Sequence, residues 1–231
     1  MSDPLFRGFS PEAMEARCQG RMLERRVGIV TDFLSGLKDL GAGPVLELGA
    51  GTGQTMMLVS RSFPTVRFLA VEPVGEYVRY AQGKYTRVNS LLDYRDGTAD
   101  TLSLPDNSVA CAYSVNIWHH IDAVSLQGSA AGVARVLKAG GRYLVVEPNF
   151  RHPYVSTYQA WMRRERNFLP WRELKVLQEF FVVEKASFYF ALPEFIRVPP
   201  LWLSRAEQAL ERCPMLAGSV AYVLRKKRFM L

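Results

Sequence analysis

The stretch that decides the fold reads Pro44-Val45-Leu46-Glu47-Leu48-Gly49-Ala50-Gly51-Thr52-Gly53-Gln54. A short apolar run, typical of a buried strand, leads into three alternating glycines and then into a helical segment over residues 54–59. Glycines at these positions let the backbone turn sharply and approach a ligand closely, because no side chain intervenes. The helix that follows directs free amides and a positive dipole end to the same place. The stretch therefore predicts a site for a nucleotide-like ligand.

A carboxylate follows the next predicted strand. Residues 66–71 form a second apolar run, which ends in Glu72-Pro73, and Glu72 lies 19 positions after Gly53. In a βαβ unit this offset places an acidic side chain at the end of the neighbouring strand, where it can accept both hydroxyls of a ribose. The alternative interpretation is an exposed loop glutamate.

The glycine spacing distinguishes between classes of nucleotide site. A dinucleotide site requires G-x-G-x-x-G, and here the third glycine comes one residue too early. The E-x-G-x-G-x-G form resembles motif I of the class I S-adenosylmethionine-dependent methyltransferases. The resemblance implies S-adenosyl-L-methionine as cofactor and S-adenosyl-L-homocysteine as product. It assigns cofactor binding to Glu47, Gly49, Ala50, Gly51, Thr52, Gly53, Glu72 and Pro73.

The middle of the chain resembles the type-11, UbiE-like subgroup of the same family. The similar segments are Gly97-Thr98-Ala99-Asp100, the turn at 105–108, the predicted strand at 109–115 and His119-His120-Ile121. By this resemblance the cofactor site also includes Gly97, Thr98, Ala99, Ser114, Val115 and Asn116. Two positions depart from the subgroup pattern. Thr98 replaces a common Asp, which leaves the adenine contact open between Thr98, Asp96 and Asp100, and Ala110 replaces the Asp that usually opens the strand.

The remaining periodicity completes an α/β fold. Residues 130–138 have helical spacing, closed by Gly140 or Gly141, and strands are predicted at 142–148, 181–190 and 218–227. By resemblance we expect a Rossmann-like methyltransferase fold with a seven-stranded, mostly parallel sheet, an antiparallel terminal strand and helices on both faces. We expect an N-terminal helical cap over residues 1–43 and a methyltransferase domain over 44–231. Substrate lids are expected at about 151–179 and 191–216.

Composition excludes several classes of protein. Three widely separated cysteines argue against a disulfide framework or a metal cluster, so no metal is expected. No apolar run is long enough for a membrane span, and we expect a cytoplasmic protein. The net charge of +7 lies entirely after Phe150, where 14 Lys/Arg face 7 Asp/Glu. This basic segment could face an anionic substrate, RNA or a membrane surface, or could be an ordinary solvated face.

Methyl transfer itself requires mainly alignment of donor and acceptor and exclusion of water. A base helps where the acceptor loses a proton. By position, the candidates for this base are His119, His120, Glu147 and His152. For His119 and His120 a purely structural role at the head of a helix is the competing interpretation. Arg151, Tyr154, Tyr158 and Trp161 are the predicted substrate-binding residues.

We therefore expect S-adenosylmethionine-dependent methyl transfer to an oxygen, nitrogen or carbon of a small aromatic, lipid-like or anionic acceptor. The alternatives are an RNA or membrane-lipid methyltransferase that uses the basic C-terminal part, and a non-catalytic cofactor-binding protein. The expected partner is a small molecule and not a nucleic acid, with peripheral membrane contact left open. The chain is expected to be a monomer or a homodimer.

Overall fold

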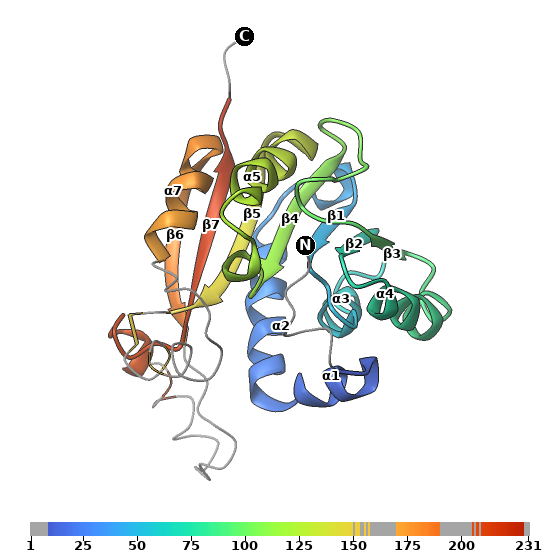
Figure 1. Cartoon of the computed structure of the whole chain (residues 1–231), viewed down its shortest axis with the longest axis horizontal. Coiled ribbons are helices and arrows are strands. Elements are labelled where there is room, and N and C mark those ends of the chain that lie inside the picture. The colour runs from blue at the N-terminus through green and yellow to red at the C-terminus, as the bar shows by residue number, and fades with distance from the viewer. Residues whose placement is uncertain are drawn as a thin grey trace.

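The central sheet has the mixed topology that the sequence predicts. The computed structural model describes residues 9–149, 151, 152, 155, 157, 170–189, 205, 207 and 209–228. In this part of the chain one sheet has the strand order β3-β2-β1-β4-β5-β7-β6 (Figure 1). The strands are β1 (Val45–Leu48), β2 (Phe68–Glu72), β3 (Leu92–Asp96), β4 (Val109–Val115), β5 (Leu137–Pro148), β6 (Phe181–Tyr189) and β7 (Ser219–Lys226). Only β7 runs antiparallel to its neighbours, β5 and β6, which confirms the predicted fold.

Helices cover both faces of this sheet. The described helices are α1 (Pro11–Arg17), α2 (Gly20–Ser35), η1 (Leu40–Ala42), α3 (Gln54–Ser60), α4 (Gly75–Ala81), η2 (Gln82–Thr86), η3 (Trp118–His120), α5 (Ser125–Val136) and α7 (Pro170–Phe180). The α5 and α7 helices lie on one face, and α2, α3 and α4 lie on the other (Figure 1). The Ser10 side chain caps α1 by accepting a hydrogen bond from the Ala13 amide, and a proline follows at the first helical position.

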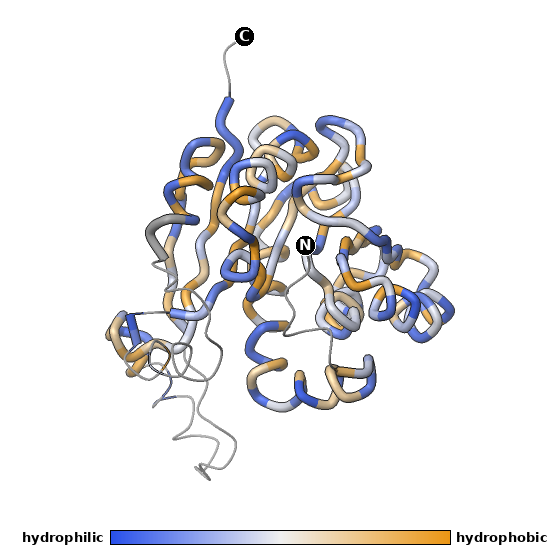
Figure 2. The backbone as a smooth tube through the Cα atoms, viewed as in Figure 1, coloured by the Kyte–Doolittle hydropathy of each residue, from blue (hydrophilic) through white to orange (hydrophobic). Residues whose placement is uncertain are grey.

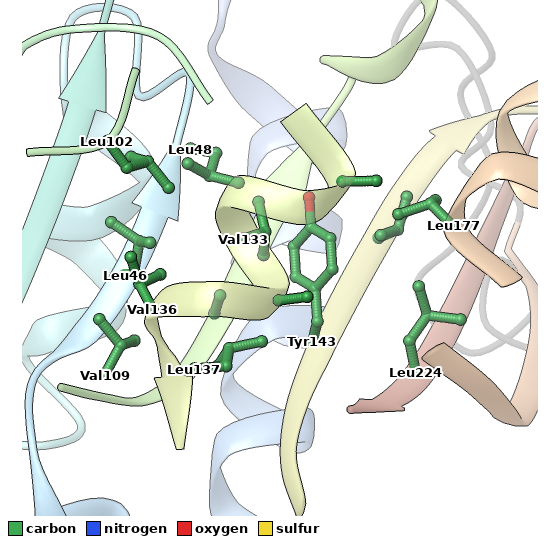
Figure 3. Close-up of a cluster of buried hydrophobic side chains, with 14 of the residues drawn as sticks. Leu46, Leu48, Leu102, Val109, Val133, Val136, Leu137, Tyr143, Leu177 and Leu224 are labelled. Carbon is green, nitrogen blue, oxygen red and sulfur yellow. The ribbon is translucent and has the colours of Figure 1, made fainter. Parts of the chain in front are cut away.

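Two apolar layers hold the helices to the sheet. On the α5 side, Val133 and Val136 pack with Tyr143 of β5 and Leu224 of β7 (Figure 3). On the other face, α2 and α3 pack against alternate residues of the same strands. Every residue of β1 and β2 is buried, as expected for parallel strands covered on both faces. Along the helices, hydrophobic residues recur between groups of hydrophilic ones (Figure 2). This is the pattern of helices with one face on a core.

One predicted boundary was wrong. The helix expected to reach Lys138 and close at Gly140 or Gly141 ends at Val136, and β5 begins at once with Leu137. Gly140 does have a left-handed φ of 70°, but it lies within β5. Leu137 pairs with Val109 of β4, and the register then shifts before Cys111. Pairing with β4 therefore ends the helix earlier than its own spacing indicates.

Six strands run in the same direction, so their carboxyl ends meet at one edge of the sheet. This carboxyl edge gathers the glycine turn after β1, Glu72 at the end of β2, and the segments that follow β3, β4 and β5. In open α/β sheets, ligands bind at this edge, where the strand order reverses. Here the reversal falls between β1 and β4.

Candidate cofactor and methyl-transfer site

The three glycines of the turn have different structural roles. Gly49, Gly51 and Gly53 all have positive φ, at 65°, 54° and 82°. A Cβ at Gly49 would lie 2.0 Å from Ile117 Cδ1, and a Cβ at Gly53 would lie 2.5 Å from Tyr94 Cε1. A Cβ at Gly51 would meet nothing within 4 Å. A side chain at Gly53 would clash with the Tyr94 ring and one at Gly49 would have to displace the Ile117 side chain, whereas Gly51 faces open space.

Glu72 joins the glycine turn to the end of β2. Its side chain is buried, with Oε2 accepting a hydrogen bond from the Gly51 amide (2.8 Å) and Oε1 accepting one from the Val74 amide (3.0 Å). Burial raises the pKa of Glu72, and the two backbone hydrogen bonds partly offset this effect. The carboxylate thus lies beside Gly51, as the sequence spacing predicts, while Pro73 next to it is exposed.

Glu47 of β1 is a second buried carboxyl group on the same face of the sheet. Burial raises its pKa to about 8, and the nearby Tyr113 hydroxyl moderates the rise. Among the described residues, no hydrogen bond reaches Glu47 Oε2 or the buried Oε1 of Gln54. Buried polar atoms are normally hydrogen-bonded, so these two atoms mark places where a ligand or water is expected. The sequence identified Glu47 through its motif; Gln54 was missed as a site residue.

The loop after β3 supplies the residues predicted near the adenine. The Gly97 amide donates to the Glu72 carbonyl (3.2 Å), which ties this loop to the end of β2. Thr98 hydrogen-bonds Asp100 and also contacts Thr101 Oγ1 (2.6 Å). The Ala99 carbonyl packs against α5, where a Cβ at Gly132 would come within 2.3 Å of it. The loop is therefore fixed from both sides.

Of the residues predicted at and just after the end of β4, Ser114 has structural partners. It is fully buried, and its hydroxyl lies 2.7 Å from Tyr143 Oη, which also accepts a hydrogen bond from Trp118 Nε1 (2.7 Å). Asn116 has a left-handed φ of 58°, and its amide donates to the Val146 carbonyl (2.8 Å). Val115 is partly buried on the α2 side. These residues lie at the carboxyl edge beside the glycine turn.

Glu147 and His119 form a buried pair. Glu147 Oε1 accepts hydrogen bonds from the amides of Ile117 and Trp118, at 2.9 Å each. Glu147 Oε2 lies 2.6 Å from His119 Nδ1, and the ring centroids of His119 and His120 lie 3.8 Å apart with the rings tilted by 45°. Glu147 thus caps η3 and orients His119, a contact between residues 28 positions apart that the sequence did not reveal. A base role for these residues stays a prediction.

The residues after β5 are only partly described. The His152 amide donates to the Asn149 carbonyl (2.9 Å), and Arg151 is exposed. Asn149 Nδ2 donates to the carbonyls of Pro214 (2.5 Å) and Ala217 (2.7 Å), so Asn149 fixes the segment before β7 to the end of β5. Asn149 was not among the residues predicted from the sequence, although it directly follows the Glu147-Pro148 pair. The predicted substrate residues Tyr154, Tyr158 and Trp161 lie outside the described residues.

The N-terminal helices also reach the carboxyl edge. Glu15 of α1 accepts hydrogen bonds from Tyr80 (2.6 Å), Lys84 and Tyr85, which fastens α1 to α4 and η2. Burial opposes ionisation of Glu15, but these donors outweigh it and lower the pKa. Arg25 of α2 pairs with Glu211.

In the described part of the chain, no helix is long and apolar enough to cross a membrane. The same residues contain no cluster of three or more His, Cys, Asp or Glu side chains suited to a metal ion.

Comparisons with known proteins agree with this geometry. The profile of a family described as "Methyltransferase domain" matches residues 45–141. An uncharacterized methyltransferase of Mycobacterium tuberculosis is 38% identical over 99 residues, which are 42% of this chain and 37% of that protein. A malonyl-[acyl-carrier protein] O-methyltransferase of Methylococcus capsulatus is 31% identical over 122 residues, 52% of this chain and 42% of that protein. The match thus spans less than half the length of these relatives.

The similarity in structure extends further along the chain. A geranyl diphosphate methyltransferase solved in complex with S-adenosylmethionine superimposes with a TM-score of 0.61. The superposition covers 90% of this chain and 92% of that one at 18% sequence identity. At 18% sequence identity the similarity concerns the fold alone. It extends to helices and strands outside residues 45–141.

Proposed function

We propose, from the premise that residues 45–141 of this chain form a class I methyltransferase domain, that the protein binds S-adenosylmethionine at the carboxyl edge and transfers its methyl group to a small-molecule acceptor. One observation carries the proposal. Gly51 faces open space, and the Glu72 carboxylate lies beside it and accepts a hydrogen bond from the Gly51 amide.

The residues present fit this cofactor. Gly51 leaves room for a ligand against the backbone, and Glu72 supplies the acceptor that ribose hydroxyls require. Glu47 Oε2 and Gln54 Oε1 are buried oxygens that, among the described residues, accept no hydrogen bond. They suit the donors of an amino acid ammonium group. When bound, S-adenosylmethionine supplies a methyl group already activated by its sulfonium charge.

Electrostatics supports the same ligand. The carboxyl groups of Glu47 and Glu72 interact with each other, and Asp96 contributes further negative charge near Glu72. A cationic ligand would favour the ionised form of these carboxyl groups, and attraction between opposite charges is stronger where water is excluded.

For an acceptor that loses a proton, the His119–Glu147 pair is the best supported of the proposed bases. Its 2.6 Å contact fixes one ring nitrogen of His119, which is how a carboxylate orients a histidine that takes up a proton at the other nitrogen. His120 and His152 stay alternatives. We further propose that residues 1–43 form a helical cap on the domain of residues 44–231. Of the lids predicted at about 151–179 and 191–216, the part that forms α7 packs on the sheet instead. The remaining parts are proposed to select the acceptor, with Arg151 as one of its contacts.

Release of S-adenosylhomocysteine across a panel of aromatic, lipid-like and anionic acceptors tests this proposal. Wild type is expected to release product with at least one class of acceptor, and Gly51→Arg is expected to release none because the side chain fills the open space at the turn. Gly83→Arg is the matched control, since Gly83 also has nothing within 4 Å of a Cβ and is exposed. Cofactor binding without product for every acceptor would favour a non-catalytic binding protein. Equal activity of the Gly51→Arg and Gly83→Arg variants would refute the assigned site.

A further inference from the structure

A cavity of about 490 Å³ opens at the amino edge of the sheet, opposite the glycine turn. Two walls enclose it: the segment that follows α2 and the first residues of β5, with the start of β4 between them. It is lined by residues 36–40, 42, 110, 111 and 138–142. This volume is within the range of small-molecule sites. The proposed methyl-transfer reaction makes no use of this amino-edge cavity.

The lining of the amino-edge cavity is cationic. The lining contains three cationic side chains, those of Lys38, Lys138 and Arg142, and one carboxylate, that of Asp39. Lys138 Nζ donates to the Ala42 carbonyl and so connects the two walls. Lys38 is exposed and has no ion-pair partner in the part of the chain that the structure describes. An anion would therefore find at least one cation that is not already neutralised.

The neighbouring strands add further positive charge. Arg142 of β5 pairs in register with Arg225 of β7, and both guanidinium groups donate to the single Glu184 carboxylate, at 2.7 Å each. One carboxylate cannot balance two guanidinium groups. The chain then continues through Lys226, Lys227 and Arg228, so this end of β7 is hydrophilic (Figure 2). Arg225, which belongs to the basic part of the chain after Phe150, thus lies beside Arg142 of the cavity lining.

The floor of the cavity limits the kind of anion. It is formed by small and aliphatic residues, and no aromatic side chain is among the lining residues. Single-stranded RNA sites use aromatic rings on which bases stack, so this lining does not suit RNA. Burial raises the pKa of the Cys111 thiol to about 12, so this residue is an inert part of the floor.

We propose that the amino-edge cavity binds a small organic anion that carries phosphate or carboxylate groups, at a site separate from that of methyl transfer. Lys38 and Arg142 supply charge, while Leu37 and Leu40 contact the apolar part of the ligand. Gly140 has a left-handed φ of 70°, and a Cβ there would meet nothing within 4 Å, so the ligand can approach the backbone.

Titration of amide NMR spectra with inorganic pyrophosphate and, separately, with citrate tests this site. We expect saturable shifts at residues 36–42 and 138–142 for at least one of the two probes, and the better probe identifies the preferred anionic group. Lys38→Gln is expected to weaken binding about tenfold, because one charge-assisted contact is lost. Lys175→Gln, which removes the same charge from an exposed position of α7, is the matched control and is expected to bind as wild type.

Three outcomes would overturn the proposal: no saturable shift with either probe up to about 10 mM, an equal effect of Lys38→Gln and Lys175→Gln, or shifts spread over all basic side chains. A short RNA that binds more tightly than both probes, with shifts at 225–228 and not at the cavity walls, would indicate a nucleic-acid surface instead. S-adenosylmethionine affinity, measured on the same variants, is expected to be unchanged by Lys38→Gln. Failure at this site is therefore distinguishable from failure of the proposed methyl-transfer site.

Discussion

Alanine substitutions at Gly49 and Gly51 are expected to differ in their main effect. Gly49→Ala is expected to lower stability more, and Gly51→Ala is expected to lower ligand affinity more. Both residues are in the left-handed region, which costs an L-residue about 1–2 kcal/mol. For Gly51→Ala that is the whole cost, because the new methyl group meets nothing within 4 Å. For Gly49→Ala the methyl group overlaps Ile117 Cδ1 at 2.0 Å, and overpacking adds about 1–3 kcal/mol.

Thermal unfolding and calorimetric titration separate the two effects. For a domain of this size each kcal/mol lowers the melting temperature by roughly 2–4 °C, so Gly49→Ala is expected to melt clearly below Gly51→Ala. S-adenosylmethionine affinity is expected to show the reverse order: Gly51→Ala places a methyl group in the ligand's space, whereas folded Gly49→Ala keeps that space open. Wild-type affinity in Gly51→Ala, or equal melting temperatures for the two variants, would refute the assignment of Gly51 to the ligand and Gly49 to packing.

Three further predictions concern the buried acids. Glu147→Gln is expected to lower the free energy of unfolding by about 1–3 kcal/mol in chemical denaturation, since the amide cannot accept all three hydrogen bonds; an unchanged value would contradict this role. Because the folded-state pKa of Glu47 is raised to about 8, the folded protein holds a proton that the unfolded chain releases above about pH 4.5. The free energy of unfolding is therefore expected to fall as the pH rises from about 4.5 to about 8. Denaturation curves at pH 5 and pH 8 measure this fall, which is expected to be smaller in Glu47→Gln. Glu15→Gln is expected to speed amide exchange over Pro11–Arg17 and leave exchange in β1 unchanged, because α1 is fastened to α4 and η2 through this side chain.

The sheet could be predicted because its strands are short apolar runs that end at glycine, proline or acidic residues. Glu72 is an example: its distance from Gly53 along the chain placed it beside the glycine turn, and the hydrogen bond to Gly51 confirms that position. The end of α5 could not be predicted, because pairing of Leu137 with β4 overrides the helical spacing of the local sequence.

The partners of the site residues were also hidden in the sequence. The motif does not show that Gly49 and Gly53 are required by Ile117 and Tyr94, which lie far along the chain and reach the turn only in the folded sheet. The same holds for the His119–Glu147 pair, which depends on the parallel register of β4 and β5. Sequence periodicity specifies which face of an element is buried, but not which side chain meets it from another element.

The central claim is that a buried carboxylate beside an open glycine turn holds an adenosyl group. Titration of S-adenosylmethionine into the purified protein measures this. One-to-one binding is expected for wild type and for Glu76→Gln, an exposed acid on α4, with affinity weakened about tenfold or more in Glu72→Gln. Absence of binding at about 1 mM ligand, or equal affinity of the two variants, would contradict the account.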